Sequence, residues 1–91
     1  MSRLLDEAGI AAALGGTPGW ARAGAEIKRT YTCRDFVEAL AFVNRVGGLA
    51  ERAAHHPDID IRYHRVTLTL TTHDAGGLTV KDFELARAID Q

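Results

Sequence analysis

The chain has 91 residues, 11 of them basic and 12 acidic, and a formal net charge of −1. This length predicts a single domain, residues 1–91, that buries roughly 60–65% of the surface its unfolded chain exposes, so oligomerisation would add useful burial. The balanced charge, with no stripe of Lys and Arg, argues against direct nucleic-acid binding, which needs a patch that neutralises phosphates. No apolar run approaches the ~20 residues of a membrane span, so we expect no membrane partner.

Cys33 is the only cysteine. A single cysteine excludes a disulfide framework within the chain and favours a reducing compartment. The acidic Asp6 and Glu7 fit neither a signal peptide nor a transit peptide. We therefore expect a cytoplasmic protein, and we interpret Cys33 as a small apolar residue near a helix start rather than as a nucleophile.

The first half of the chain predicts two helices and one main strand. Apolar residues at helical spacing predict a helix over residues 2–14. A short strand is expected near Trp20, and residues 26–31 alternate as a strand does. Thr32-Cys33-Arg34-Asp35 has the form of a capping box. It predicts a long helix that runs to about Ala53, despite two consecutive glycines inside it.

The second half predicts two strands and a last helix. Pro57 disfavours helical backbone in the residue before it, so the long helix must end shortly before this proline. Residues 59–63 and 65–72 alternate and predict paired strands around a turn at His64, which we expect to be exposed. Thr79-Val80-Lys81-Asp82 is a second capping box, which opens the last helix. The order of elements predicts an α+β fold: an antiparallel sheet of three to four strands with helices packed on one face, and an extra N-terminal helix.

Three of the four histidines form two short clusters. Glu51 and His55 are four residues apart at a helix end, so their side chains share a face and the carboxylate can orient the imidazole. Pro57 forces His56 into an extended conformation, so His56 points elsewhere along the loop. His73 ends a predicted strand, and strand pairing can bring it beside that loop.

Two kinds of site fit these clusters. Imidazole titrates near neutrality and suits general acid/base catalysis. It is also a common zinc ligand, and catalytic zinc sites often use three protein ligands. The histidines also have simpler explanations. A histidine at a helix end more often caps free carbonyls, and an exposed Glu–His pair is usually a solvated helix pair that adds only about 0.3–0.5 kcal/mol to stability. Spacing alone leaves the metal site and the acid/base site evenly balanced.

A longer pattern surrounds the two clusters. It reads Glu51-x-x-x-His55-His56-Pro57, then Tyr63-x-x-Val66, then Leu70-x-Thr72-His73-Asp74-x-x-Gly77-Leu78-Thr79-x-x-Asp82-x-x-Leu85-Ala86. Upstream stand Trp20, the strand Ile27-x-Arg29-x-Tyr31 and the apolar helix Phe36 to Val46. Over roughly residues 20–90 the chain resembles the pterin-4a-carbinolamine dehydratase family.

The resemblance implies a hydro-lyase that needs neither a cofactor nor a metal. Family members eliminate water from 4a-hydroxytetrahydropterin and give quinonoid dihydropterin. This reaction is a step of tetrahydrobiopterin recycling for aromatic amino acid hydroxylases. The hydroxyl that leaves C4a needs a proton and the ring N5 must lose one, and imidazole can do both near neutral pH. The resemblance therefore favours acid/base catalysis over metal binding.

Carried over by position, the resemblance implies that His55, His56 and His73 are catalytic. His56 and His73 are the expected acid/base pair, and His55, held by Glu51, contacts the substrate. The other residues expected at the pterin are Glu51, Ala54, Pro57, Thr71, Thr72, Asp74, Trp20 and Asp82. For Trp20 a place in the core, and for Asp82 a helix-capping role, are the alternatives that the residues themselves suggest.

The chain departs from the family pattern at two places. Ala54 stands where the family often has a polar residue, which removes one hydrogen bond near the site. The segment between Trp20 and Ile27 is shorter than in the animal members, which affects the placement of Trp20.

The resemblance also implies partners and alternative functions. Family members commonly form dimers or dimers of dimers by joining sheets and packing helices, so we expect a homodimer or homotetramer. Animal members also act as coactivators that stabilise dimers of a homeodomain transcription factor. Protein binding of this kind is one alternative function, and molybdopterin-related pterin handling is another.

Overall fold

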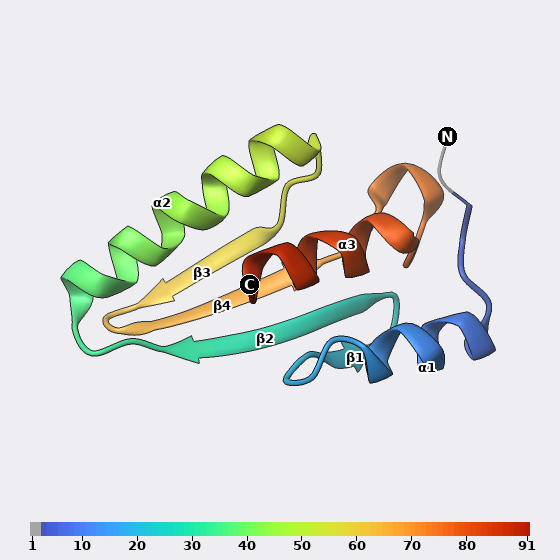
Figure 1. The fold of residues 1–91 in the computed structure, drawn as a ribbon, viewed down its shortest axis with the longest axis horizontal. Coiled ribbons are helices and arrows are strands. Elements are labelled where there is room, and N and C mark those ends of the chain that lie inside the picture. Colours follow the sequence, from blue (N-terminus) through green and yellow to red (C-terminus); the bar gives the residue numbers. More distant parts are fainter. Residues whose placement is uncertain (1–2) are drawn as a thin grey trace.

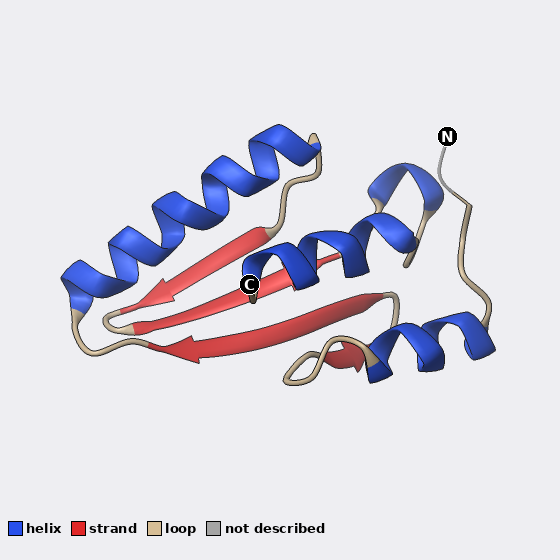
Figure 2. Cartoon of the chain, viewed as in Figure 1, coloured by secondary structure: helices blue, strands red, loops and turns tan. Residues whose placement is uncertain are grey.

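The computed structural model describes residues 3–91, so the predicted helix start at Ser2 lies outside the described residues. The elements in chain order are α1 (Glu7–Gly15), β1 (Ala21–Ala23), β2 (Glu26–Thr32), α2 (Phe36–Ala53), β3 (Asp58–Arg62), β4 (Arg65–Leu70), the short 3-10 helix η1 (His73–Ala75) and α3 (Val80–Ile89). The strands form one antiparallel sheet in the order β1-β2-β4-β3. Figure 1 shows how the elements are arranged, and Figure 2 separates the helices from the sheet. The predicted α+β fold with an N-terminal helix is confirmed.

The core lies between β4 and the two long helices. In β4, Val66, Leu68 and Leu70 are fully buried, while the threonines between them are half-buried on the opposite side of the strand. This alternation is the one predicted, and it follows from the two-residue period of an extended chain. The helices cover the buried side with a set of mostly small or aliphatic residues and one phenylalanine. These are Ala39, Val46, Ala50, Phe83, Leu85, Ala86 and Ile89.

α1 starts later than predicted. Asp6 is its N-cap, and the Asp6 carboxylate accepts a hydrogen bond from the backbone N–H of Gly9 at 2.8 Å. Leu5 precedes this cap, and its N–H donates to the carbonyl of Leu78 at 2.9 Å. The predicted helical conformation of Leu4 and Leu5 is therefore wrong, because this segment bonds to the chain before α3 rather than to a helical turn.

α2 begins at Phe36, and its N-cap is Asp35 rather than Thr32. Asp35 Oδ1 accepts from the N–H of Glu38 at 2.8 Å, while Thr32 still pairs with Arg65 in the sheet. The predicted capping box at residues 32–35 is wrong, because sheet pairing extends further than the local sequence indicates. The predicted end of this helix at Ala53 is confirmed. None of the helices in residues 3–91 combines the length and apolar character that a membrane crossing requires.

β3 and β4 form the predicted hairpin with shifted ends. Tyr63, with a φ of 53°, and His64 make the turn. His64 is half-buried rather than exposed as expected, and its carbonyl accepts from the N–H of Cys33 at 2.7 Å. β4 ends at Leu70, two residues earlier than predicted, and Thr72 instead forms an isolated bridge with Gly77.

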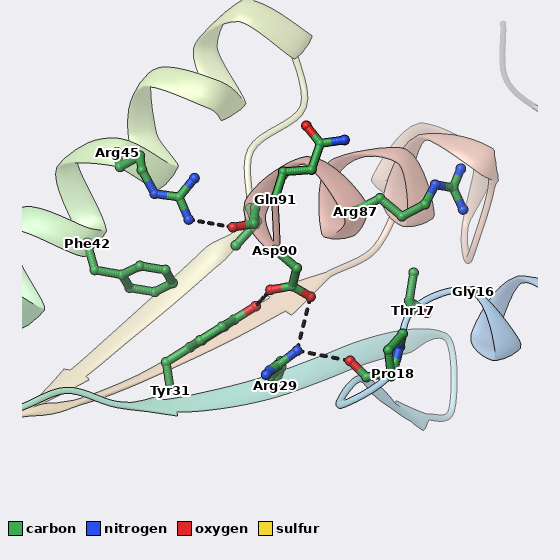
Figure 3. A pocket seen from close by; sticks show the side chains of 11 residues that line it. Gly16, Thr17, Pro18, Arg29, Tyr31, Phe42, Arg45, Arg87, Asp90 and Gln91 are labelled. Carbon is green, nitrogen blue, oxygen red and sulfur yellow. Dashed lines mark hydrogen bonds and ion pairs between the residues drawn. The ribbon is translucent and has the colours of Figure 1, made fainter.

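The side chain of Asp90 links the C-terminal end of α3 to β2 and to Trp20 (Figure 3). Its carboxylate oxygens accept hydrogen bonds from Trp20 Nε1 at 2.8 Å, from Arg29 Nη1 at 3.0 Å and from the Tyr31 hydroxyl. Burial raises the pKa of Tyr31 well above its usual value, and the bond to Asp90 raises this pKa further, so the hydroxyl remains protonated and donates. These contacts join α3 to β2 and to the segment before β1.

We expect Asp90→Ala to lower the free energy of unfolding by about 1–3 kcal/mol, because partly buried donors lose their acceptor. Urea unfolding followed by the fluorescence of Trp20 measures the change. Glu84→Ala is the matched control, since Glu84 is exposed on α3 and its side chain makes no hydrogen bond within residues 3–91. The control should stay within about 0.5 kcal/mol of the original chain. Equal losses in the two variants would contradict this role of Asp90.

Candidate active site

A cavity of about 220 Å³ opens where α2 and β4 end and α3 begins. Its lining comes from the loop after α2, from the four residues after β4 and from the first turn of α3. The lining residues are Ala54, His55, His56, Thr71, Thr72, His73, Asp74 and Lys81. We call this space the histidine cavity, because three of the four histidines line it.

Ala54 turns the chain between α2 and the first two histidines. It has left-handed backbone angles (φ 52°, ψ 40°), which cost a residue other than glycine roughly 1–2 kcal/mol. The N–H groups of Ala54 and His55 donate to the carbonyls of Glu51 (3.2 Å) and Ala50 (3.1 Å), as in a normal left-handed helix end. After this turn His55 is buried, with 9% of its surface exposed, whereas His56 remains at the surface.

His55 is held by Asp82 from the first turn of α3. His55 Nε2 lies 2.6 Å from Asp82 Oδ1, and Asp82 is fully buried. Asp82 Oδ2 accepts two further hydrogen bonds, from the hydroxyl of Thr72 and from the N–H of Thr79, both at 2.9 Å. Because a carboxylate only accepts, His55 Nε2 carries the proton of this hydrogen bond, and Nδ1 is the ring nitrogen that Asp82 leaves free.

His56 is paired with Glu51. The distance from His56 Nε2 to Glu51 Oε2 is 2.9 Å, and both side chains are largely exposed (63% and 80%). The predicted pairing of Glu51 with His55 is therefore wrong. That prediction assumed a helix through His55, but the left-handed turn at Ala54 ends the helix earlier and rotates His55 away from Glu51.

His73 lines the histidine cavity from the segment that follows β4. It is exposed and opens η1, next to the exposed Asp74. Thr71 anchors this stretch, because its hydroxyl donates to the carbonyl of Ala25 at 2.7 Å. A second hollow of about 380 Å³ adjoins the cavity and shares Thr71 and His73 with it.

The predicted site residues divide into two groups. His55, His56 and His73 come together, and Ala54, Thr71, Thr72 and Asp74 also line the cavity. The others do not line it. Asp82 lies behind His55 and completes the capping box of α3 as well, while Glu51 reaches the site through His56. Trp20 is a buried core residue bonded to Asp90, and Pro57 follows His56 without lining the cavity.

Lys81 is the lining residue that the sequence reasoning missed. In the sequence, the signal that could have indicated Lys81 was its position inside the second capping box, one residue before Asp82. A lysine beside a capping carboxylate is ordinarily an exposed helix residue, so only the packing of α3 against the loop after α2 indicates a role for it.

Two other features bear on the choice of site. Within residues 3–91, no group of three or more His, Cys, Asp or Glu side chains is arranged to hold a metal ion. A larger cavity, of about 720 Å³, surrounds the C-terminal end of α3 and shares no lining residue with the histidine cavity. In it, Arg29 and Tyr31 both donate hydrogen bonds to Asp90 (Figure 3), so these polar groups are already paired and we assign the candidate site to the histidines.

One buried and two accessible imidazoles line a small cavity, an arrangement that can serve acid/base chemistry on a small molecule. Comparison with known proteins gives this site its family. The family model for pterin 4 alpha carbinolamine dehydratase matches residues 3–91. The chain therefore belongs to the pterin-4a-carbinolamine dehydratase family, whose activity is that of a hydro-lyase.

Relatives in sequence and in structure agree with this assignment. The chain is 56% identical over 91 residues to a protein of Roseiflexus castenholzii that carries this family's name, covering 100% of the chain and 98% of that protein. It is 60% identical over 87 residues to a protein of the same name from Chloroflexus aurantiacus, covering 96% and 94%. A crystal structure of a transcriptional coactivator/pterin dehydratase from Brucella melitensis superposes with a TM-score of 0.90 at 33% identity, covering 94% of each chain.

We expect Asp82→Asn to lower the free energy of unfolding by about 1–3 kcal/mol, because the amide cannot accept from all three buried donors. Urea unfolding measures the change. Asp74→Asn is the control, since Asp74 lines the same cavity but is exposed and makes no side-chain hydrogen bond within the described residues. Superimposable unfolding curves for the two variants would refute the structural role of Asp82.

Proposed function

We propose that the histidine cavity is where this chain dehydrates pterin-4a-carbinolamine, with His56 and His73 as the acid/base pair. The chain is a pterin-4a-carbinolamine dehydratase by family. One observation supports this placement: two exposed imidazoles line the same small cavity from two different segments of the chain, and a third imidazole in the lining is held by Asp82.

The chemistry needs one proton donor and one proton acceptor. The bond from C4a to its hydroxyl breaks as an acid protonates the leaving oxygen, and water departs. The N5–H bond breaks as a base takes the proton, and its electron pair forms the new double bond between N5 and C4a. Imidazoles suit both tasks near neutral pH, and each of two accessible histidines can face one of the two reacting atoms. The product is the quinonoid dihydropterin.

The remaining lining residues are proposed to bind and orient the ring. His55 offers Nδ1 toward the substrate, because Asp82 holds Nε2. Thr71, Asp74 and Lys81 supply a hydroxyl, a carboxylate and an ammonium group, which match the mixed donors and acceptors of a reduced pterin. Glu51 orients His56 through its hydrogen bond, and Thr72 acts through Asp82 rather than on the ring.

We expect His56→Ala and His73→Ala each to slow the dehydration of 4a-hydroxytetrahydropterin by at least about 100-fold, because each removes one proton-transfer group. Stopped-flow absorbance measures the rate. Both side chains are exposed, so the unfolding midpoints should change little. His64→Ala is the control, because His64 lies in the β3–β4 turn outside the cavity, and its rate should match that of the original chain.

The test needs both the dehydration rate and the unfolding curve of each variant. Original rates in both His56→Ala and His73→Ala, with intact unfolding curves, would refute the assignment of the site. The same assay with a chelator addresses metal dependence. Loss of activity with the chelator would support the metal-site alternative instead of acid/base catalysis alone.

We also propose that the chain forms a homodimer or homotetramer through the β3 edge. Among residues 3–91, β3 is the last strand of the sheet, so the backbone groups on its outer side pair with no strand of that part of the chain. Its Ile59 and Ile61 are 37% and 39% exposed, and α2 adds Phe36, Val37 and Leu40 at 45%, 75% and 40%. A second copy related by a two-fold axis can pair with this edge and cover these apolar side chains.

Ile61→Lys should shift the chain toward a monomer, because a buried charge at the proposed interface would lack a partner. Sedimentation velocity measures the mass. Ala11→Lys, on the exposed side of α1, is the matched control and should leave the mass unchanged. A monomeric original chain, or a variant at Ile61 that assembles as before, would contradict the proposed interface.

We propose, finally, a cytoplasmic role in recycling reduced pterins for an aromatic amino acid hydroxylase. The free Cys33 supports a reducing compartment. The Brucella melitensis protein is described as a transcriptional coactivator as well as a dehydratase, and the exposed apolar residues of α2 could serve a protein partner in place of a second copy. Assembly of the purified chain alone favours the homo-oligomer over this second role.

A further inference from the structure

The larger cavity, at the C-terminal end of α3, is separate from the histidine cavity. It encloses about 720 Å³ and is lined by the loop after α1, by β2, by α2 and by the end of α3 (Figure 3). This volume lies in the range of about 300–1,000 Å³ that is typical of small-molecule sites. We call it the arginine cavity, because Arg29, Arg45 and Arg87 all line it. The proposed dehydration uses none of these residues.

Arg29 is fixed in place and its charge is neutralised. Its Nη1 atom donates to Asp90 Oδ2 at 3.0 Å and to the carbonyl of Pro18 at 2.9 Å. Its guanidinium carbon lies 4.7 Å from the centre of the Tyr31 ring. Gly19 makes room for this guanidinium, because a Cβ at that position would lie 2.5 Å from Nη1. Arg29 and Asp90 therefore form one side of the cavity, and this side carries no net charge.

Among residues 3–91, the other two arginines keep donors without partners. Arg45 of α2 donates from Nη2 to the carbonyl of Ile89 and forms no ion pair with these residues. Arg87, an exposed residue of α3, forms neither a side-chain hydrogen bond nor an ion pair with them. Asp90 is the only carboxylate side chain in the lining, so the three arginines leave two positive charges in excess. Such a cavity favours an anionic ligand with a charge of about −2.

Aromatic rings from two elements stand beside these arginines. The ring centres of Tyr31 in β2 and Phe42 in α2 are 4.5 Å apart, and both side chains are half-buried. The guanidinium carbon of Arg45 lies 5.7 Å from the centre of the Phe42 ring. In Figure 3, Phe42 and Arg45 lie on one side of Asp90 and Arg87 lies on the other. The cavity thus offers an aromatic surface for a planar ring as well as donors for an anion.

Charge and shape together indicate the class of ligand. A carboxylate supplies one negative charge, whereas a phosphate monoester carries about −1.5 to −2 near pH 7 and so matches the two excess positive charges. The fork of N–H donors on a guanidinium also fits the oxygens of a phosphate. Inorganic phosphate alone would leave the aromatic rings and most of the volume unused. The ligand that uses all of these features has a planar ring joined to a phosphate.

We propose that the arginine cavity binds a nucleoside monophosphate. Arg45 and Arg87 bind the phosphate, and the base packs against the rings of Tyr31 and Phe42. This site is distinct from the histidine cavity, with which it shares no lining residue. The inference does not depend on the dehydration reaction.

Isothermal titration calorimetry at low salt tests this site, with AMP as the probe. Adenosine lacks the phosphate and inorganic phosphate lacks the ring, so we expect each to bind at least about tenfold more weakly than AMP. Arg87→Gln and Arg45→Gln should each weaken AMP binding by about tenfold, the effect of losing a hydrogen bond to a charged group, and leave adenosine binding unchanged. Arg52→Gln is the matched control, because Arg52 is an exposed residue of α2 outside both cavities, and it should bind AMP like the original chain.

Three results would overturn the proposal. The first is no binding of AMP, or inorganic phosphate that binds as tightly as AMP, which would indicate a surface that attracts any anion. The second is unchanged AMP affinity in Arg87→Gln, a variant that should keep its fold because Arg87 is exposed and makes no side-chain hydrogen bond within residues 3–91. The third is competition between AMP and 7,8-dihydrobiopterin, since it would place AMP in the histidine cavity. Unaltered dehydration rates in His56→Ala and His73→Ala would refute the proposed function but leave AMP binding intact.

Discussion

The contact between His55 and Asp82 is the interaction on which the site depends. The two residues are 27 positions apart, yet their side chains meet at 2.6 Å in the buried region between α2 and α3. Polar groups in such a place are costly unless every one of them is bonded. Thr72 and the backbone of Thr79 complete the set, so the end of β4, the start of α3 and the loop after α2 are fixed to one another.

This buried network explains how a small chain can present several imidazoles. Asp82 has two tasks, since it caps α3 through the N–H of Thr79 and holds the ring of His55. Asp82 therefore fixes the orientation of the His55 ring, while His56 and His73 line the same cavity with exposed side chains. The buried part of the site is built from hydroxyl, carboxylate and imidazole groups, whereas the side chains of His56 and His73 are exposed at the cavity.

Much of the fold could be predicted from local sequence. The alternation in β4, the capping box at Thr79 and the end of α2 near Pro57 each depend on neighbouring residues and were confirmed. The two misplaced helix starts share one cause. Thr32 and Leu5 have backbone partners that are distant in sequence, Arg65 and Leu78, and no local pattern reveals them. Long-range pairing therefore overrode the helix starts that the sequence indicated.

The sequence by itself predicted that three histidines gather at one site and indicated which family the chain resembles, because the two histidine clusters and their flanking residues are continuous motifs. Only the tertiary structure decided which carboxylate serves which imidazole. Because of the left-handed turn at Ala54, Glu51 pairs with His56 and not with His55. The packing of α3 brings Asp82 to His55 instead. Helical spacing cannot predict this change of partners. Residues four apart share a face only while the helix continues, and the carboxylate that pairs with His55 belongs to a different helix.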